Sequence, residues 1–260
     1  MSIACTDAGL SVGHKTLLEG VDARFLPGRV CAILGPNGAG KSTLLSLLCA
    51  QRPPTRGRVM LDDRDIGSHS PAALALRRAV MPQESSVAFD FNAEEIVALG
   101  RLPHRLAPEP QEHRIVPEAM TLTGVAGLAH RVLNTLSGGE KARVHLARAL
   151  AQLWHPRPDG TTRWLMLDEP TAALDVAHQH SVMALARRWA GQGVGVVAVL
   201  HDLNLALRYA DEVIVLSQGR KVAQGETAQV LQPALVSEIW RTPCELVSGR
   251  DGAPQFLFGG

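Results

Sequence analysis

The sequence contains little cysteine. Only four of the 260 residues are cysteines, and their spacing fits neither a metal site nor a disulfide framework. Two of them, Cys31 and Cys49, stand within apolar runs, so we predict that both are small core residues. Cysteines that form no disulfide framework are typical of proteins in a reducing cytoplasm.

Long hydrophobic runs and a signal-peptide pattern are also missing from the sequence. The longest apolar run, near Gly193–Leu200, is far too short to span a bilayer. The first residues, Met1–Asp7, lack the basic and apolar regions of a signal peptide. We therefore expect the chain itself to be soluble and any role at a membrane to depend on a partner.

A strong charge of either sign is absent as well. The 26 basic and 25 acidic residues leave a net charge of +1, which gives no broad electrostatic case for binding nucleic acid or an anionic membrane surface. What the chain does have is length and apolar content. Its 260 residues, 46% of them hydrophobic, can bury a sizeable core in one large domain or a domain with a subdomain.

Strand-like and helix-like segments alternate along most of the chain. Apolar runs at Val30–Leu34, Trp164–Leu167 and Val194–Leu200 predict buried strands, and a helical pattern follows each of them. The first 30 residues read as short strands and turns, and helical patterns dominate Asn92–Leu136. This alternation predicts an α/β fold whose mainly parallel sheet is covered on both faces.

A glycine-rich loop lies between the strand Val30–Leu34 and a predicted helix, Ser42–Cys49. It matches the phosphate-binding pattern G-x-x-x-x-G-K-[ST] in full. Glycines let the backbone approach an anion, and N–H groups at the helix start then face the phosphates. Lys41 adds a mobile charge for the β- and γ-phosphates, and the Ser42 hydroxyl is a Mg²⁺ ligand. The alternative is a chance glycine-rich loop. The predicted triphosphate-binding residues here are Gly35, Pro36, Asn37, Gly38, Ala39, Gly40, Lys41, Ser42 and Thr43.

Two acidic residues, Asp168 and Glu169, end the apolar strand Trp164–Leu167. Ligands of open α/β sheets bind at the carboxyl ends of strands, and adjacent acids there are costly unless a cation or a reaction uses them. We predict that Asp168 orients Mg²⁺ and that Glu169 positions or activates the attacking water as general base. The alternative is an acidic turn at a strand end.

A second glycine-rich helix start stands in the stretch Leu136–Glu140, which reads Leu-Ser-Gly-Gly-Glu. Its hydroxyl and its free N–H groups make a second candidate anion site at Ser137, Gly138 and Gly139. The alternative is an ordinary capped helix.

Together these motifs resemble the ATPase subunit of ATP-binding cassette (ABC) transporters. Leu136–Glu140 resembles the family's signature, Gln83 its Q-loop glutamine, Ala173–Asp175 its D-loop and His201 its switch histidine. The resemblance runs from about Leu10 to Val230. It implies one ABC ATPase domain over 1–260: a P-loop NTPase core with an N-terminal antiparallel β subdomain (about 1–90 and 155–260) and an inserted helical subdomain (about 91–154).

The resemblance also implies a mechanism that needs two copies of the chain. Two subunits are expected to sandwich two ATP molecules head to tail, so that Ser137–Gly139 of one grip the γ-phosphate held by Lys41 of the other. His201 is expected to contact the γ-phosphate and stabilise developing charge, and Asp175 to lie at the nucleotide. Gln83 is expected to touch Mg²⁺ and water and to couple the site to a membrane partner. Taken alone, His201 reads as a polar strand end and Gln83 as a structural residue.

The chain departs from the family pattern at the residue that is expected to stack on the adenine base of ATP. The family usually stacks an aromatic residue on the base, just before a glycine in the first strands, but here Val12 precedes Gly13. The nearest stacking candidate is His14, which reads equally well as a solvated turn residue.

Finer features resemble importers of metal chelates, namely haem, siderophores and cobalamin. The stretches Phe89–His104 and His201–Ala206 resemble that group. The loop Leu153–Arg163 and the tetrapeptide Ala177–His180 resemble haem importers, although we expect the two histidines of the tetrapeptide, His178 and His180, to lie on a solvated helix face.

The resemblance implies that the chain is the ATPase subunit of an importer and couples ATP hydrolysis to the import of haem through a membrane permease. Its expected partners are a second copy, a permease in two copies and, indirectly, a periplasmic binding protein. The expected location is the cytoplasmic face of a bacterial inner membrane. The alternatives are a siderophore or cobalamin importer and, more distantly, an ABC ATPase of DNA repair or translation. Nucleic acid is not an expected partner.

Overall fold

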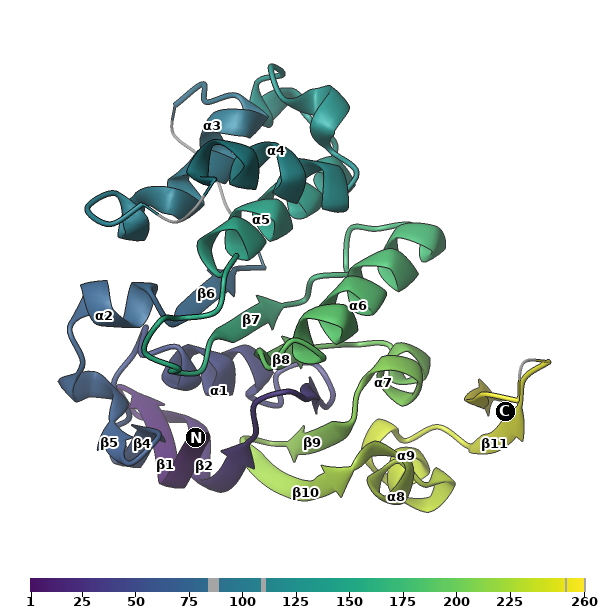
Figure 1. Ribbon diagram of the computed structural model, residues 1–260. Helices are drawn as coiled ribbons and strands as arrows, with labels where there is room; N and C mark the ends of the chain where they lie inside the picture. The colour runs from purple at the N-terminus through teal and green to yellow at the C-terminus, as the bar shows by residue number, and fades with distance from the viewer. Residues whose placement is uncertain (84–88, 109–110, 251, 260) are drawn as a thin grey trace.

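The structure is a computed structural model that describes residues 1–83, 89–108, 111–250 and 252–259. Two larger sheets lie in the lower part of the view, and a helical part lies above them (Figure 1). The N-terminal sheet is antiparallel with the order β2-β1-β4-β5. Its strands are β1 (Ile3–Val12), β2 (Lys15–Phe25), β4 (Arg56–Leu61) and β5 (Arg64–Asp65).

The central sheet has the order β10-β9-β3-β8-β7-β6. All of its pairs from β9 to β6 are parallel, and β10 at the edge runs antiparallel to β9. This arrangement confirms the predicted fold class. The strands are β3 (Val30–Leu34), β6 (Arg78–Met81), β7 (Trp164–Asp168), β8 (Gly195–Val199), β9 (Glu212–Ser217) and β10 (Arg220–Glu226).

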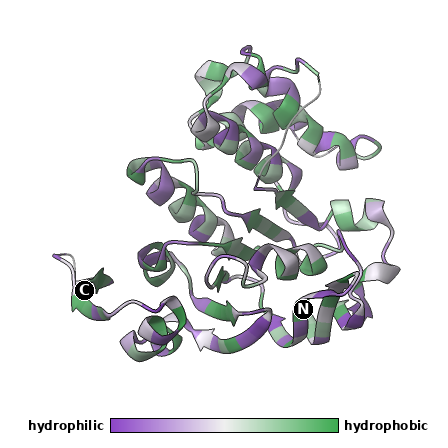
Figure 2. Cartoon of the chain, turned by 180° about the vertical axis from the view of Figure 1, so that it is seen from behind, coloured by the Kyte–Doolittle hydropathy of each residue, from purple (hydrophilic) through white to green (hydrophobic). Residues whose placement is uncertain are grey.

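The inner strands of the central sheet are buried on both faces. In β3, Ala32 packs with helices α5 (Gly138–Gln152) and α6 (Val176–Ala190), whereas Ile33 packs with α1 (Lys41–Leu48) on the other face. Successive side chains of a strand point to opposite faces, which is why these strands are continuously apolar (Figure 2). Cys31 and Cys49 are both buried, at 3% and 0% exposure, which confirms that they are core residues.

A separate hydrophobic cluster holds the helical part together. It joins α5 to α3 (Ala93–Ala98) and α4 (Glu112–Leu122). Helix α5 serves two cores, because Val144 faces this cluster while Leu150 faces the central sheet. The helices agree with the predicted helical stretch, and the exact division of the chain near 91 and 154 stays a prediction.

The remaining elements connect these parts or follow them. Helix α7 (Leu203–Tyr209) lies with α6 on one face of the central sheet. The short connecting elements are η1 (Ile66–Ser68), α2 (Pro71–Ala75), η2 (Leu99–His104), η3 (Ala126–Leu128) and η4 (Leu133–Thr135). The C-terminal elements, which the sequence pattern did not predict, are α8 (Thr227–Val230), α9 (Pro233–Trp240), β11 (Cys244–Ser248) and β12 (Pro254–Phe258).

The N-terminal strands are longer than predicted. The sequence indicated short strands and turns, but β1 and β2 run for 10 and 11 residues. Register shifts in their pairing accommodate the polar and glycine residues that suggested turns, and Asp7 takes a left-handed φ of 49° there. Bulges of this kind absorb an extra residue without ending a strand.

The loop at 155–163 is tied to the core at its end. Arg163 is 5% exposed, donates to the backbone carbonyls of Leu153 and Trp154, and lies 6.0 Å from the centre of the Trp189 ring. Trp154 packs edge-on against Trp189 at 5.9 Å. The loop therefore joins the end of α5 to α6.

Replacing Gly195 with alanine should destabilise the central sheet. A Cβ at Gly195 would lie 2.4 Å from the ring of Trp164, which is fully buried. Overpacking of this kind costs about 1–3 kcal/mol, and urea unfolding should show that loss. The control is Gly127→Ala, where nothing lies within 4 Å of the added Cβ. Equal stability of the two variants would contradict the prediction.

Candidate nucleotide site

Predicted residues of the phosphate loop meet Glu169 and His201 at the carboxyl ends of the central strands. A cleft of about 450 Å³ lies there between the loop after β3, the acidic end of β7 and His201 after β8. Ligand sites of open α/β sheets form at this edge. The lining residues are Lys15, Thr16, Leu17, Asn37, Gly38, Ala39, Gly40, Lys41, Ser42, Thr43, Glu169, His201, Gln218 and Gly219.

The phosphate loop needs its glycines because it runs tightly against two other segments. Gly35 has φ 148°, and a Cβ there would lie 2.1 Å from the carbonyl oxygen of Leu216 in β9. Gly40 has φ 100°, and its Cβ would lie 2.9 Å from the carbonyl oxygen of Leu17 in β2. Only glycine fits both positions, so close packing adds to the reason that the sequence indicated.

Lys41 is held at the mouth of the loop. Its ammonium donates to the carbonyl oxygens of Gly35, at 2.8 Å, and Pro36, at 3.0 Å. Burial lowers the pKa of Lys41, and the nearby carboxylates of Glu169 and Asp168 oppose that change. The ammonium of Lys41 therefore lines the cleft close to two carboxylates, which compensate its charge.

Ser42 and Asp168 are hydrogen-bonded to each other and bring two oxygen atoms together. The Ser42 hydroxyl donates to Asp168 Oδ1 at 3.0 Å. Burial raises the pKa of Asp168, and the hydrogen bond from Ser42 counteracts this. A hydroxyl beside a partly buried carboxylate fits Mg²⁺, which takes one or two carboxylates together with substrate phosphates. Within the described residues, no three His, Cys, Asp or Glu side chains cluster as a metal site of their own.

Glu169 is held from two sides. Its Oε1 lies 2.6 Å from His201 Nε2, and its Oε2 accepts a 2.7 Å hydrogen bond from Gln83 Nε2. The Glu169 backbone takes a left-handed φ of 50°, which is strained for a residue with a side chain. The carboxylate contacts both His201 and Gln83, so three residues predicted for catalysis lie together.

The signature residues lie apart from the phosphate loop of the same chain. Ser137 caps α5 in a capping box with Glu140, and Ser137 and Gly138 are exposed. Ser137 does not line the phosphate cleft. Gly138 lines a second cleft, of about 700 Å³, together with Gln83 and Glu169. One chain therefore presents two candidate anion sites, in two clefts that both include Glu169 in their lining.

The D-loop packs against the signature. A Cβ added to Gly139 would lie 2.9 Å from the carbonyl oxygen of Ala173. Asp175 then caps α6 by accepting from the His178 N–H at 2.9 Å, and its carboxylate pairs with the His178 ring. His178 and His180 are both half-buried, and His180 Nδ1 lies 2.9 Å from Tyr209 Oη, so the helix face that was predicted to be solvated is only partly exposed.

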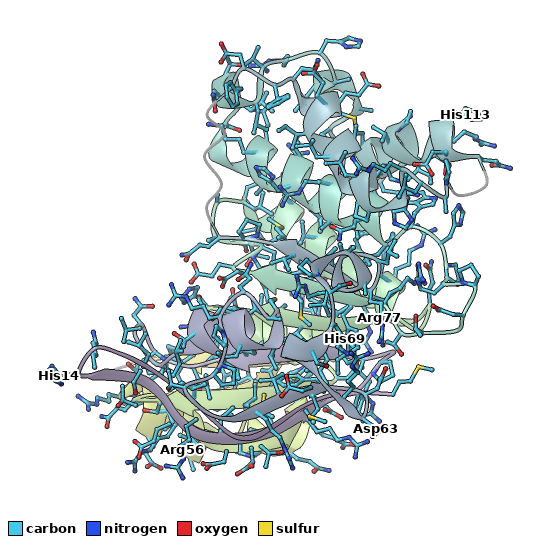
Figure 3. All side chains as sticks on the ribbon, turned by 90° about the vertical axis from the view of Figure 1, so that its left-hand side faces the viewer. His14, Arg56, Asp63, His69, Arg77 and His113 are labelled. Carbon is cyan, nitrogen blue, oxygen red and sulfur yellow. The ribbon has the colours of Figure 1, made fainter. Side chains whose placement is uncertain are left out.

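His14 lies outside the cleft. It is exposed at the tip of the β1–β2 turn, where its side chain projects from the molecule (Figure 3). The neighbouring Lys15, Thr16 and Leu17 line the cleft in its place. Sequence reasoning missed these three residues, together with Gln218 and Gly219, because no motif marks them. Adenine stacking by His14 stays a prediction.

Comparison with known proteins decides the family. The sequence model of the ABC transporter family matches residues 18–172, which is more than half of the chain. The chain belongs to the ABC transporter family. As an ABC transporter ATPase it binds and hydrolyses ATP as part of a transporter, which confirms the resemblance seen in its motifs.

Curated relatives match this ABC ATPase over most of its length. The hemin import ATP-binding protein HmuV of Methylobacillus flagellatus is 45% identical over 96% of this chain and 93% of the relative. The protein of the same name from Gloeobacter violaceus is 49% identical over 86% of this chain and 82% of the relative.

Solved ABC structures share the fold. An inward-facing ABC transporter assigned to the metal-chelate type superposes with a TM-score of 0.80 at 25% identity, covering all of this chain and 97% of that one. A dimeric ATP-binding cassette with bound ADP and phosphate superposes with a TM-score of 0.75 at 25% identity, covering 86% of this chain and 98% of that one. Among the described residues, no helix is long and apolar enough to cross a membrane.

A buried histidine of α5 should make this ABC ATPase sensitive to acid. His145 is 4% exposed and lines the second cleft with Gln83. Burial, aided by Arg148, lowers the pKa of His145 from 6.5 to about 4. Between these values the unfolded chain binds the proton and the folded chain does not, so stability falls as the pH falls from 6.5 to 4.

Replacing His145 with glutamine should remove part of this pH dependence. The loss of unfolding free energy between pH 7 and pH 4.5 should shrink by about 2 kcal/mol, because about 1.4 kcal/mol corresponds to one unit of pKa. Urea unfolding at both pH values measures it. His130→Gln is the control, since the His130 side chain is 90% exposed. An unchanged difference between the two pH values in His145→Gln would contradict the prediction.

Proposed function

We propose that this ABC ATPase powers the import of hemin. The observation that carries the proposal is the agreement of its relatives: several proteins named hemin import ATP-binding protein HmuV are 42–49% identical and align over 85% or more of this chain. The loop at 153–163 and the tetrapeptide Ala177–His180 agree with this substrate class.

We infer that the working unit contains two copies of the chain. The phosphate loop and the signature lie in different clefts of one chain, and a head-to-tail pair would bring Ser137–Gly139 of one copy onto the nucleotide of the other. The dimeric cassette among the structural relatives supports this arrangement. Asp175, in the D-loop beside the signature, would then lie at the same interface.

The residues of the cleft have distinct roles in ATP hydrolysis. The phosphate loop binds the triphosphate through its N–H groups, and Lys41 moves its ammonium onto the β- and γ-phosphates. Glu169 takes a proton from the attacking water, whose oxygen bonds to the γ-phosphorus. The bond from that phosphorus to the β–γ bridging oxygen breaks, and ADP and phosphate are the products.

Two further side chains position the reaction. His201 contacts Glu169 and would donate to the γ-phosphate, where it stabilises the charge that develops. Gln83 contacts the other oxygen of Glu169 and would join the site to the permease. Mg²⁺ would be held by Ser42, Asp168 and Gln83 with phosphate oxygens, and it would neutralise charge on the phosphates.

An importer built from separate subunits needs a permease and a substrate-binding protein in addition to this ATPase. An integral membrane permease, in two copies, would carry the hemin, and a periplasmic binding protein would deliver it. The ATPase would then lie at the cytoplasmic face of the bacterial inner membrane, attached through the permease.

Reconstitution tests the substrate. The chain, the permease that co-purifies with it and the periplasmic binding protein are placed in vesicles, and ATP hydrolysis is measured with hemin, a ferric siderophore and cobalamin in turn. Hemin should stimulate hydrolysis and accumulate, whereas a Lys41→Ala complex should do neither. Stimulation by another chelate alone would contradict the proposal, as would recovery of the chain with ribosomes or DNA and no permease.

A further inference from the structure

The C-terminal hairpin is anchored to the body of the protein by Phe256 of β12, and Cys244 of β11 also contacts Ser237 of α9. Strands β11 and β12 pair only with each other among the described residues. A two-stranded hairpin is marginal in water on its own, so its order must come from what it packs against. Phe256 is 2% exposed and belongs to the core cluster of the central sheet, while its neighbours Gln255 and Leu257 are exposed.

A polar contact fixes the same point. The side chain of Asn204 exchanges two hydrogen bonds with the backbone of Phe256. Its Oδ1 accepts from the Phe256 N–H at 2.6 Å, and its Nδ2 donates to the Phe256 carbonyl oxygen at 3.2 Å. The amide pairs with the backbone N–H and C=O of Phe256 as a neighbouring strand would. These two hydrogen bonds fix the position of β12 relative to Asn204.

This contact lies close in the chain to the reacting groups. Asn204 is the second residue of α7, and Asp202 caps the helix by accepting from the N–H groups of Asn204, at 2.7 Å, and Leu205, at 3.0 Å. His201 directly precedes this cap, and its Nε2 lies 2.6 Å from Glu169 Oε1. A shift at the start of α7 therefore moves the histidine.

The far end of α7 is held by a different element. Tyr209 Oη lies 2.9 Å from His180 Nδ1 of α6, and Arg187 of α6 donates to the Tyr209 carbonyl oxygen at 3.4 Å. Helix α7 is thus attached to α6 at its C-terminal end and to the hairpin at its N-terminal end. In Figure 1 the hairpin lies at the edge of the molecule on the side of α7.

We propose that Asn204 and Phe256 are positioning residues for His201, so that the C-terminal hairpin sets the rate of ATP hydrolysis from outside the cleft. The inference rests on the proposed role of His201 at the γ-phosphate. Neither residue lines the nucleotide cleft, so nucleotide binding is independent of them. Their effect is on the placement of the imidazole, and small misplacements of a reacting group can slow chemistry by up to about 100-fold.

Two substitutions test the proposal in the full chain. Asn204→Ala and Phe256→Ala should each lower kcat for ATP hydrolysis about 10- to 100-fold with less than about a 2-fold change in the Kd for ATP. Phe256→Leu keeps an apolar side chain in the pocket and should retain most of the rate. Leu257→Ala is the matched control, because this neighbour on β12 is 50% exposed and should leave kcat unchanged. Unchanged kcat in both Asn204→Ala and Phe256→Ala would overturn the proposal.

A double-mutant cycle separates positioning from a general loss of stability. If Asn204 acts through His201, adding Asn204→Ala to His201→Ala should cause no further loss in single-turnover hydrolysis. The same fold loss in both backgrounds would overturn the proposal while leaving the role of His201 intact. Near-normal hydrolysis by His201→Ala alone would instead refute the proposed role of His201.

The position of the His201 ring can also be measured directly, which serves if ATP hydrolysis by His201→Ala is too slow to measure. In nuclear magnetic resonance spectra, Asn204→Ala should shift or broaden the ring signals of His201 and leave those of exposed His130 in place. Unchanged His201 signals would overturn the proposal whatever the rates are.

Discussion

Glu169→Gln should abolish ATP turnover and leave ATP binding intact. Glutamine keeps the shape of the side chain and can still accept a hydrogen bond from Gln83 or His201, so the strained backbone at φ 50° should persist. What disappears is the carboxylate that accepts a proton from water. General bases contribute about 10²- to 10⁴-fold, so kcat should fall at least 100-fold.

The expected state of the variant is an ATP-bound dimer. Because hydrolysis would no longer separate the copies, Glu169→Gln with ATP should elute from gel filtration as a dimer, while the wild type should return to its initial state. The control is Glu118→Gln, a glutamate of α4 whose side chain is 44% exposed and whose partner is Arg114 one helical turn earlier. Near-normal hydrolysis by Glu169→Gln would rule out Glu169 as the base.

Ser137→Arg should block hydrolysis and spare ATP binding by an isolated chain. Ser137 is exposed and lines no part of the phosphate cleft of its own chain. An arginine there would obstruct the nucleotide face of the other copy. The substitution also removes the N-cap of α5, at a cost of about 1 kcal/mol, so Ser137→Thr, which keeps the capping oxygen, is the control and should retain activity. Loss of ATP binding by monomeric Ser137→Arg would contradict the assignment.

Mixing two inactive chains tests whether the signature acts on the partner's ATP. In a dimer of Ser137→Arg with Lys41→Ala, one nucleotide site combines an intact Lys41 with an intact Ser137, and the other site has both defects. Single-turnover hydrolysis should therefore return in the mixture. No recovery in dimers isolated through two different tags would mean that Ser137 and Lys41 serve the same chain.

The local elements of the site could be predicted because their chemistry lies in consecutive residues. Gly35–Ser42 contains the strand end, the turn and the helix start that a phosphate needs, and the observed helix begins at Lys41, one residue before the predicted Ser42. Helices α3 and α4 both lie within the stretch Asn92–Leu136 that was predicted to be helical. The long strands β1 and β2 were missed because bulges hide polar and glycine residues inside them.

The family, the phosphate loop, the acid pair and the signature could all be identified from the sequence, because each depends on a few adjacent residues. The tertiary structure was needed to show that Glu169 contacts both Gln83 and His201, that Gly138 of the signature lines a different cleft from Lys41, and that Phe256 docks on Asn204. These relations depend on which strands are neighbours in the central sheet and on how the last residues fold back. Local propensity and periodicity do not specify such pairings, because they result from packing between segments far apart in the chain.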